Sequence, residues 1–279
     1  MNIVNEIFSK SNSIEELTSI DSESFKKNYF DKKKPVLIKG FAKNWGATKK
    51  WDLDFFSNLK FEHDIHLISG DFIQGDNRYN TGVFKSFIKD LKEAEDKNKT
   101  TKQYLTTLNI FDYLPSLNDD IDFSLFEKFT KINDVSAWIG PSGTISGFHR
   151  DSGKNMYAQI KGKKMFIICS PKFNKNMYPS SKYMNGAVPS QVDINNFEAE
   201  KFPKFKDVEF KSIILEPGDV LYIPQNWWHY VQSLDTSISI SNFGYTKNEL
   251  YSIKFPEKVL DFLHRRGIYK SKNCFCCDS

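Results

Sequence analysis

The chain has 279 residues, of which 39% are hydrophobic and 15% aromatic, and its 39 Lys and Arg against 35 Asp and Glu give a formal net charge of +4. This length supports one or two domains with a large core, and the aromatic content excludes a wholly disordered chain. A charge of +4 over this length does not indicate nucleic-acid binding, and no apolar stretch approaches the roughly 18 residues of a membrane-spanning helix.

The N-terminus and the four cysteines indicate a reducing intracellular compartment, the cytoplasm or the nucleus. The first residues lack the basic start and the roughly 7–15-residue apolar core of a signal peptide. Cys169 stands in an apolar run and is expected to be buried. Cys274, Cys276 and Cys277 fall in the last six residues, and we expect a disordered tail over residues 271–279 because chain termini are usually loose. Metal binding, lipidation and redox sensing are the alternatives for that tail.

The first half of the chain predicts helices and short strands. Residues 22–30 place aromatic side chains at helical spacing behind a Ser22 cap, and residues 35–40 predict a short buried strand. Residues 83–95 predict an amphipathic helix, because their apolar side chains fall on one stripe. The polar residues 93–101 predict a solvated loop, and two acidic segments, 117–122 and 193–207, predict loops inserted between strands.

From residue 135 onward, short and closely spaced strands are expected, at residues 136–140, 155–160, 164–169, 212–215, 219–223, 229–233 and 237–243. Many short strands with tight turns are typical of an antiparallel barrel or sandwich. After residue 245 the pattern returns to helix, and neither an internal repeat nor a Pro/Ser-rich linker interrupts the chain. We therefore predict a single mainly β domain, 1–279, divided into an N-terminal helical and strand part (1–134), a barrel core (135–245) and a C-terminal helical part (246–270).

Three residues of the barrel core form a candidate metal site. If residues 149–151 are extended, His149 and Asp151 point to the same side, because strand side chains alternate with period two. His229 follows 80 residues after His149, behind a hydrophobic strand that begins with Glu-Pro-Gly-Asp. Two His and one carboxylate with open positions make the facial triad of non-haem Fe(II) oxygenases. The alternative is that His149 is a loop residue and His229 a core residue packed beside Trp228.

Lys164 is a candidate anion-binding residue. It lies 15 residues after His149, in the strand expected at residues 164–169. A cation that points into a barrel costs free energy unless an anion meets it. The free carboxylate of 2-oxoglutarate, which chelates iron through its other end, is such an anion, and Lys164 would bind it as a point charge. Lys161 and Lys163 are better explained as turn lysines in water.

Residues 138–169 resemble the JmjC-type 2-oxoglutarate oxygenases, as do residues 216–229 (Glu-Pro-Gly-Asp-Val-Leu-Tyr-Ile-Pro through Trp-Trp-His) and residues 239–243 (Ser-Ile-Ser-Asn-Phe). The resemblance is closest to the small hydroxylase branch typified by the asparaginyl hydroxylase called factor inhibiting HIF. Weaker likeness extends to residues 35–40 and to Trp45 and Trp51, so most of the chain is covered. The resemblance implies a double-stranded β-helix of the cupin or jelly-roll type.

Carried over position by position, the resemblance implies an iron site and a 2-oxoglutarate site. The iron ligands would be His149, Asp151 and His229. Lys164 would pair with the distal carboxylate of 2-oxoglutarate, and the residues implied around that cosubstrate are Ser146, Tyr104, Asn155 and Asn242. Tyr104 has an ordinary strand aromatic as its alternative. Gly244 stands where the asparaginyl hydroxylase has a bulky aromatic side chain, which predicts a reshaped substrate pocket.

The resemblance implies an enzyme that uses Fe(II), 2-oxoglutarate and O₂ to hydroxylate a side chain of a protein substrate. The alternatives are demethylation of methyl-lysine, hydroxylation of a tRNA base, and a cupin-like binding protein without turnover. A protein substrate is the expected partner, with neither a membrane nor a nucleic acid indicated. A homodimer through the C-terminal helices, around residues 250–263, is a further expectation from the resemblance. His63 and His66 are expected to be surface residues and not a second metal site.

Overall fold

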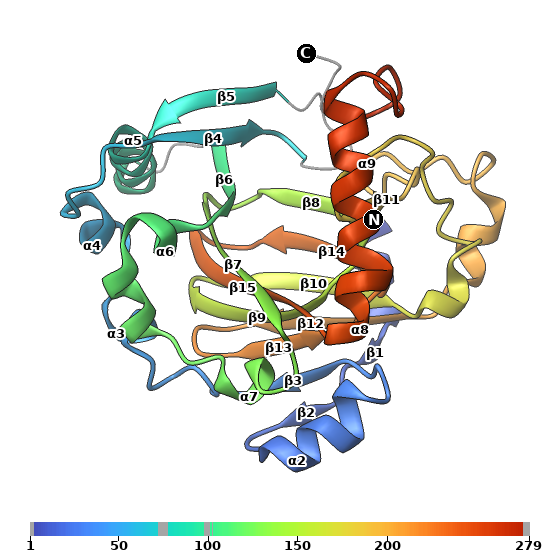
Figure 1. Cartoon of the computed structure of the whole chain (residues 1–279), viewed down its shortest axis with the longest axis horizontal. Helices are drawn as coiled ribbons and strands as arrows, with labels where there is room; N and C mark the ends of the chain where they lie inside the picture. The colour runs from blue at the N-terminus through green and yellow to red at the C-terminus, as the bar shows by residue number, and fades with distance from the viewer. Residues whose placement is uncertain (1–2, 72–77, 98–100, 102, 276–279) are drawn as a thin grey trace.

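The computed structural model describes residues 3–71, 78–97, 101 and 103–275, and its central feature is a pair of facing β-sheets (Figure 1). Sheet A has six strands in the order β1-β12-β10-β14-β8-β11. Its strands are β1 (Asn12–Ser13), β12 (Phe210–Leu215), β10 (Lys164–Cys169), β14 (Trp228–Ser233), β8 (Ile145–Asp151) and β11 (Ala187–Pro189). Apart from β1, which runs parallel to β12, neighbouring strands of sheet A are antiparallel.

Sheet B has nine strands in the order β2-β3-β13-β9-β15-β7-β6-β4-β5. They are β2 (Glu16–Leu17), β3 (Val36–Ile38), β13 (Val220–Ile223), β9 (Lys154–Lys161), β15 (Ser237–Tyr245), β7 (Ile132–Gly140), β6 (Gln103–Leu108), β4 (Asp64–Ser69) and β5 (Arg78–Val83). Four antiparallel strands from the middle of each sheet enclose the barrel interior, β12-β10-β14-β8 against β13-β9-β15-β7. This arrangement confirms the predicted double-stranded β-helix.

Helices cover the outer face of sheet B and one end of the barrel. In Figure 1, α3, α4 and α6 gather on one side, and α9 stands apart on the other. None of the helices in the described residues is long and apolar enough to cross a bilayer. The helical elements are α1 (Ile3–Lys10), α2 (Ser22–Phe25), η1 (Lys26–Phe30), α3 (Gly46–Lys50), α4 (Leu53–Ser57), α5 (Phe84–Asp96), α6 (Ile110–Tyr113), η2 (Pro115–Asp120), α7 (Ser124–Glu127), η3 (Pro171–Phe173), η4 (Pro203–Asp207), α8 (Lys247–Glu249), η5 (Leu250–Lys254) and α9 (Phe255–Arg265).

The apolar core is divided by the two sheets. The largest cluster joins sheet B to the helices and contains many of the Phe residues, including Phe56, Phe84 and Phe126. A second cluster packs on the outer face of sheet A, and only a small third cluster, with Phe166 and Ile223, lies between the sheets. Because apolar side chains fill only part of the barrel interior, space remains there for polar side chains and a ligand.

The expected strands of the barrel core are all present, with β7 and β15 longer than predicted. The helix expected at residues 83–95 is α5 (Phe84–Asp96), so the loop prediction is wrong for Glu93 and its neighbours up to Asp96. The pair Lys97–Glu93 at i,i+4 spacing helps to extend this helix beyond the apolar stripe. The cap of α2 is Asp21, which accepts from Ser24 N, and not Ser22. Residues 98–100 and 102 lie outside the described residues.

The C-terminal residues differ from the expected loose tail. Cys274 is fully buried and forms an isolated bridge with Tyr183, so residues 271–275 are docked on the protein. The expectation of a disordered tail is therefore wrong for this part, because backbone pairing and burial offset the cost of ordering the chain end. Cys276 and Cys277 lie outside the described residues. Cys169 is buried as predicted.

A buried ion pair joins the C-terminal helical part to the barrel. Lys154 on β9 pairs with Glu249, and the side chains of the two residues are only 4% and 16% exposed. Glu249 also closes a capping box with Thr246 at the start of α8. Burial lowers the pKa of Lys154, and the Glu249 carboxylate opposes that shift. The pair therefore fixes where the chain leaves β15 and begins its last helices.

Replacing one partner of this pair should destabilise the protein. Lys154→Met leaves the Glu249 carboxylate buried without its cation, and we expect the free energy of unfolding to fall by roughly 3–5 kcal/mol in urea denaturation. The double variant Lys154→Met/Glu249→Gln should recover most of that loss, because the unpaired charge is removed. The matched control is Lys163→Met, whose partner Glu216 is about half exposed, so its loss of stability should be much smaller than that of Lys154→Met. Equal losses in the two single variants would contradict this assignment.

Candidate metal centre

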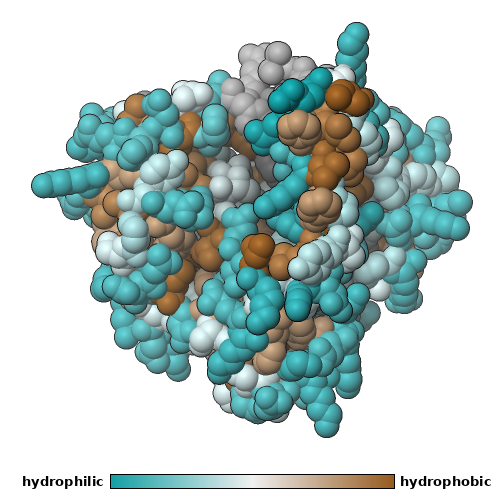
Figure 2. Space-filling model, viewed as in Figure 1, coloured by the Kyte–Doolittle hydropathy of each residue, from teal (hydrophilic) through white to brown (hydrophobic). Residues whose placement is uncertain are grey.

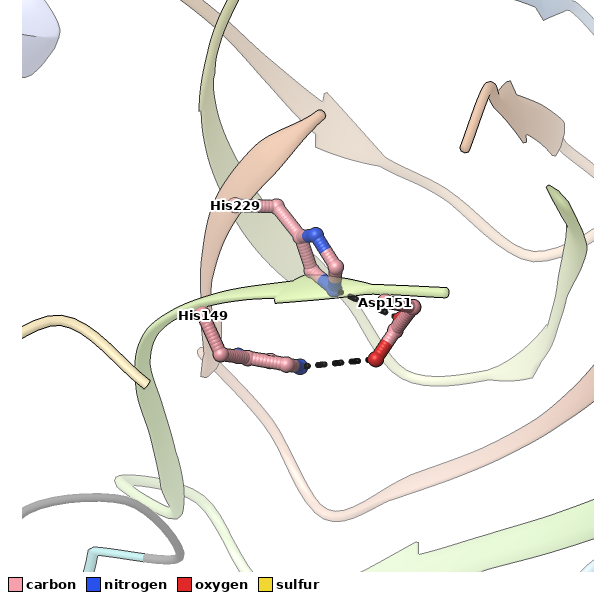
Figure 3. Close-up of side chains that lie close together, drawn as sticks. All are labelled: His149, Asp151 and His229. Atoms are coloured by element: carbon pink, nitrogen blue, oxygen red, sulfur yellow. Dashed lines mark ion pairs between the residues drawn. The ribbon is translucent and has the colours of Figure 1, made fainter. Parts of the chain in front are cut away.

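His149, Asp151 and His229 come together inside the barrel near its open end. His149 and Asp151 lie two residues apart on β8, so strand alternation turns both side chains inward. His229 on β14 is paired directly with His149 in the register of the two antiparallel strands. Figure 3 shows both imidazole rings pointing toward the Asp151 carboxylate. One strand register thus brings together residues that are 80 positions apart in the chain.

The geometry of these three side chains suits a single metal ion. The Asp151 carboxylate oxygens lie 3.9 Å from His149 Nε2 and 3.4 Å from His229 Nε2. Two ligands at about 2.1 Å from one ion and at right angles to each other are about 3 Å apart, close to these separations. One ligand atom from each residue falls within 4.8 Å of the others. The donors are two nitrogens and one carboxylate, a set that leaves coordination positions open in an octahedral ion.

Backbone carbonyls orient both imidazoles for this purpose. His149 Nδ1 lies 2.8 Å from the carbonyl oxygen of Gly147, and His229 Nδ1 lies 3.1 Å from that of Trp227. When each Nδ1–H donates to its carbonyl, each Nε2 carries a free lone pair that faces Asp151. Burial lowers the pKa of His229 well below its usual value, which keeps this imidazole neutral and able to bind a metal.

A bulge in β8 brings Ser146 to the same side as His149. His149 pairs with His229, and Ser146 pairs with Val231. Between these two pairs β8 advances by three residues and β14 by only two. The extra residue shifts the alternation, and Ser146 faces the cavity although it is three residues from His149. Strict alternation would have turned its hydroxyl away from the metal centre.

The three residues open into a cavity of about 260 Å³ between the two sheets. Its walls include the predicted residues Tyr104, Ser146 and Asn155, together with Trp138, Tyr157, Phe166, Ile223, Val231, Phe243, Tyr245, Lys254 and the segment 184–187. Pockets for drug-sized ligands start at about 300 Å³, so this volume suits a small metabolite and one side chain of a larger substrate.

Lys164 is fully buried and contacts two residues of the cavity wall. It faces inward from β10 and donates to the hydroxyls of Tyr157 at 2.9 Å and Tyr104 at 3.4 Å. Among the described residues no carboxylate forms a salt bridge with it. Burial lowers its pKa to about 7, because the charged ammonium has lost its water. An anion that enters the cavity would restore the charged form.

Tyr104 reaches this ammonium from outside the eight core strands. Its ring lies against Gly140, where a Cβ atom would stand 2.4 Å from the ring. Gly140 therefore has to lack a side chain for Tyr104 to enter the barrel. The Tyr104 hydroxyl also has Ser146 as a hydrogen-bond partner, which links two of the predicted residues to Lys164.

The structure separates the two predicted amides. Asn155 lines the cavity, and its Oδ1 is buried without a hydrogen-bond partner among the described residues. Asn242 is buried on the opposite face of β15, where its Nδ2 donates to Glu127 of α7 at 2.7 Å. The prediction of Asn242 as a cosubstrate residue is therefore wrong, because strand alternation turns Ser241 and Phe243 into the cavity instead. Gly244 also faces away, against Phe126 of α7, so it does not reshape the pocket.

Sequence reasoning missed Tyr157, whose hydroxyl is the nearer partner of Lys164. The signal was present, because Tyr157 follows Asn155 by two residues on β9 and so shares its inward face. The segment 184–187 was also missed, since nothing in its composition marks it as part of a cavity. His63 and His66 are exposed, as predicted, and no metal cluster other than the triad exists in the described part of the chain.

Comparison with known proteins identifies the family. Residues 22–249 match the model of the cupin-like domain. Lysine-specific demethylase 8 of Xenopus tropicalis is 31% identical over 228 residues, which cover 78% of this chain and 50% of that protein. Lysine-specific demethylase JMJ30 of Arabidopsis thaliana is 31% identical over 233 residues, or 82% of this chain and 54% of the relative. The chain spans about half the length of these two relatives.

A third relative is covered almost throughout its length. Human tRNA wybutosine-synthesizing protein 5 is 27% identical over 267 residues, which cover 86% of this chain and 82% of that protein. The chain thus belongs to the cupin-like family and to its JmjC-type members, as the sequence resemblance predicted. The narrower resemblance to the asparaginyl hydroxylase branch stays a prediction.

The low pKa of Lys164 makes anion binding dependent on pH. Near pH 8 the free protein holds this lysine mostly neutral, whereas a bound dicarboxylate requires the ammonium, so binding should take up close to one proton. Below about pH 7 the affinity should be constant, and above it the affinity should fall by up to about tenfold per pH unit. Calorimetry of 2-oxoglutarate with the Mn(II)-loaded protein, in two buffers of different ionisation enthalpy, measures the uptake. Lys164→Arg, which stays charged, should take up no proton, and wild-type uptake near zero at pH 8 would contradict the assignment.

Proposed function

We propose that this protein is an Fe(II)- and 2-oxoglutarate-dependent dioxygenase that hydroxylates a side chain of a protein substrate. The observation that carries the proposal is that one cavity is lined both by the His149/Asp151/His229 donor set and by Tyr104 and Tyr157, whose hydroxyls contact the buried Lys164. No carboxylate in the described part of the chain forms a salt bridge with this lysine. A 2-oxoglutarate oxygenase needs both features, because the donor set holds the metal and the lysine binds the free carboxylate of the cosubstrate. Neither a structural zinc site nor an ordinary core requires a buried ammonium that is held only by tyrosine hydroxyls.

The proposed reaction converts 2-oxoglutarate, O₂ and a C–H group into succinate, CO₂ and a C–OH group. One oxygen atom of O₂ enters succinate and the other enters the product. Iron bound by His149, Asp151 and His229 would supply the redox chemistry that activates O₂. The protein's own residues bind the dicarboxylate, orient the substrate carbon and exclude water.

The residues around Lys164 support this division of work. The ammonium would bind the distal carboxylate of 2-oxoglutarate. The hydroxyls of Tyr104 and Tyr157, which contact the ammonium, would donate hydrogen bonds to the same carboxylate. Asn155 places an amide on the wall of the same cavity as the metal donors, and its carbonyl oxygen has no hydrogen-bond partner within the described ranges. Ile223, Val231 and Phe166 line the same cavity with apolar surface and limit the entry of water.

The substrate group that this chemistry would modify is proposed to be a protein side chain. A protein side chain is favoured by the resemblance to the small hydroxylase branch, and a cavity of about 260 Å³ suits one side chain beside the cosubstrate. Two relatives are named lysine-specific demethylases and one a tRNA wybutosine-synthesizing protein, so demethylation and tRNA-base hydroxylation remain competing substrates for the same chemistry. Cys169 is buried and forms no disulfide within the described residues, which supports the further proposal of a reducing intracellular location.

Turnover and its product can be tested together. With Fe(II), ascorbate and a cell lysate, the wild-type enzyme should convert 2-oxoglutarate to succinate and leave +16 Da on protein side chains in peptide mass spectrometry. Removal of iron by a chelator, or His149→Ala, should abolish both signals because a metal donor is lost. His66→Ala, an exposed histidine, is the matched control and should behave like wild type. A 14 Da loss from methylated lysines would replace hydroxylation by demethylation, and an absence of succinate would favour a binding protein.

We also propose that two copies of the chain associate through the last helix. Tyr251, Phe255, Val259 and Phe262 are 41–72% exposed and recur at helical spacing on one side of η5 and α9. Figure 2 shows hydrophobic side chains gathered along this helix. Contiguous exposed apolar surface of this kind is typical of interaction sites, and the resemblance favours a second copy as the partner.

Light scattering tests this association. The wild-type protein should show twice the mass of the 32.4 kDa chain, and the double variant Phe255→Glu/Phe262→Glu should shift it to the single mass, because charge would replace the apolar contact. Ile268→Glu changes an equally exposed apolar residue beyond the helix and should leave the mass unchanged. A wild-type mass of one chain would reject the proposal.

A further inference from the structure

One wall of the cavity is a short segment that is held by backbone contacts at both of its ends. Residues 184–187 line the cavity between Tyr183 and β11. At its far end the wall continues into β11, where Ala187 pairs with Asp151 and Pro189 pairs with His149. Gly186 also accepts from the backbone N–H of Ser152 at 2.9 Å. This end of the wall is therefore fixed to the strand that carries two of the metal donors.

The other end of the wall is fixed by the C-terminal residues. Tyr183 N donates to the carbonyl oxygen of Asn273 at 2.8 Å, and Phe275 N donates to that of Tyr183 at 3.1 Å. Cys274 lies between these two hydrogen bonds and is fully buried. Lys270 adds a hydrogen bond of 2.6 Å from its Nζ to the carbonyl oxygen of Ser181.

Side chains reinforce this backbone pairing. The Tyr183 ring packs against the tilted ring of His264, at 4.5 Å between centroids, and edge-to-face against the ring of Tyr269, at 5.6 Å. His264 Nδ1 in turn lies 2.7 Å from the Tyr269 carbonyl oxygen. Gly267, with a φ of +74°, makes the turn that brings the chain back from α9 onto Tyr183. Residues 264–275 thus hold Tyr183 from both the end of α9 and the segment beyond it.

The metal donors themselves do not depend on these contacts. His149 and His229 are placed by the pairing of β8 with β14, and Lys164 by β10, all within the barrel. Residues 264–275 contact the outer wall, whereas Tyr245 at the end of β15 and Lys254 of η5 line the cavity directly. A change in residues 264–275 should therefore move the wall that a substrate meets and leave the metal and cosubstrate sites in place.

We infer that residues 264–275 are a clamp that positions the cavity wall 184–187 for the substrate. This inference rests on the proposed function, because it assigns the clamp to substrate engagement at that same site. Tyr183 is a positioning residue in this scheme and the main contact through which the clamp acts. Its effect should appear in the capture of a macromolecular substrate and not in metal binding or in turnover of 2-oxoglutarate without substrate.

Cys274→Arg tests the clamp, because an arginine cannot fit a fully buried position and should release the pairing with Tyr183. Ile268→Arg places the same side chain at a 72% exposed position nearby and is the matched control, and Cys274→Ser should retain the clamp. Truncation after residue 268 is a second variant that removes the pairing without inserting a charge. Thermal unfolding checks that each variant is folded.

Hydrogen exchange, metal binding and modification are then compared in the four variants. Cys274→Arg and the truncation should raise early deuterium uptake in residues 181–189 severalfold, whereas Ile268→Arg and Cys274→Ser should match wild type. The Mn(II) affinity and the succinate formed without substrate should stay within about twofold of wild type, while +16 Da modification of lysate proteins falls by roughly tenfold or more.

Two results would overturn the clamp. One is wild-type exchange of residues 181–189 in both clamp variants, and the other is a loss of Mn(II) affinity as large as the loss of modification, which would show a general structural role. These outcomes are separate from a failure of the proposed function. If the wild-type enzyme forms no succinate, the oxygenase proposal falls, but the exchange experiment still decides whether residues 264–275 hold the wall.

Discussion

The register between β8 and β14 is the constraint on which the site depends. It places His149 opposite His229 and, through a one-residue bulge, turns Ser146 into the same cavity. A slip of one residue would turn every inward side chain of β14 outward and separate the three metal donors. The apolar face of sheet A opposes such a slip, because Trp228 and Tyr230 are buried on its outer side and cannot exchange places with His229. Core packing and site geometry are therefore enforced by the same side chains.

The charged groups around the cavity determine how a ligand is oriented in it. The metal donors attract a cation, and Lys164, which contacts the cavity residues Tyr104 and Tyr157, attracts an anion, so the charges favour one orientation of a ligand with one chelating end and one free carboxylate. In the free protein the buried ammonium has lost its hydration, and this unfavourable desolvation lowers the pKa of Lys164. Two tyrosine hydroxyls hold the ammonium without neutralising it, which preserves its affinity for a carboxylate.

Much of the barrel and its site could be predicted from the sequence, since period-two alternation and short turns are local signals. His149, Asp151 and His229 come together because each lies on a strand with a readable pattern, and the strand pattern also places Lys164 on β10 against Tyr104 and Tyr157 of the cavity wall. Local patterns did not reveal which face of β15 carries Asn242, because both faces of that strand are buried. The docking of Cys274 was equally hidden, since it depends on a partner, Tyr183, that lies 91 residues earlier in the chain.

The pairing of β1 with β12 has a consequence for the order in which the molecule assembles. Asn12 and Ser13 lie beside Lys211 and Ser212, nearly two hundred residues later, so the edge of sheet A stays open until most of the chain exists. His229 and the C-terminal residues follow later still. During synthesis the first half must therefore wait with unpaired strand edges, a state that slows folding and exposes the chain to aggregation. The metal donors follow the same order, because His149 and Asp151 have to wait for His229, which is made 78 to 80 residues later, before the three can meet.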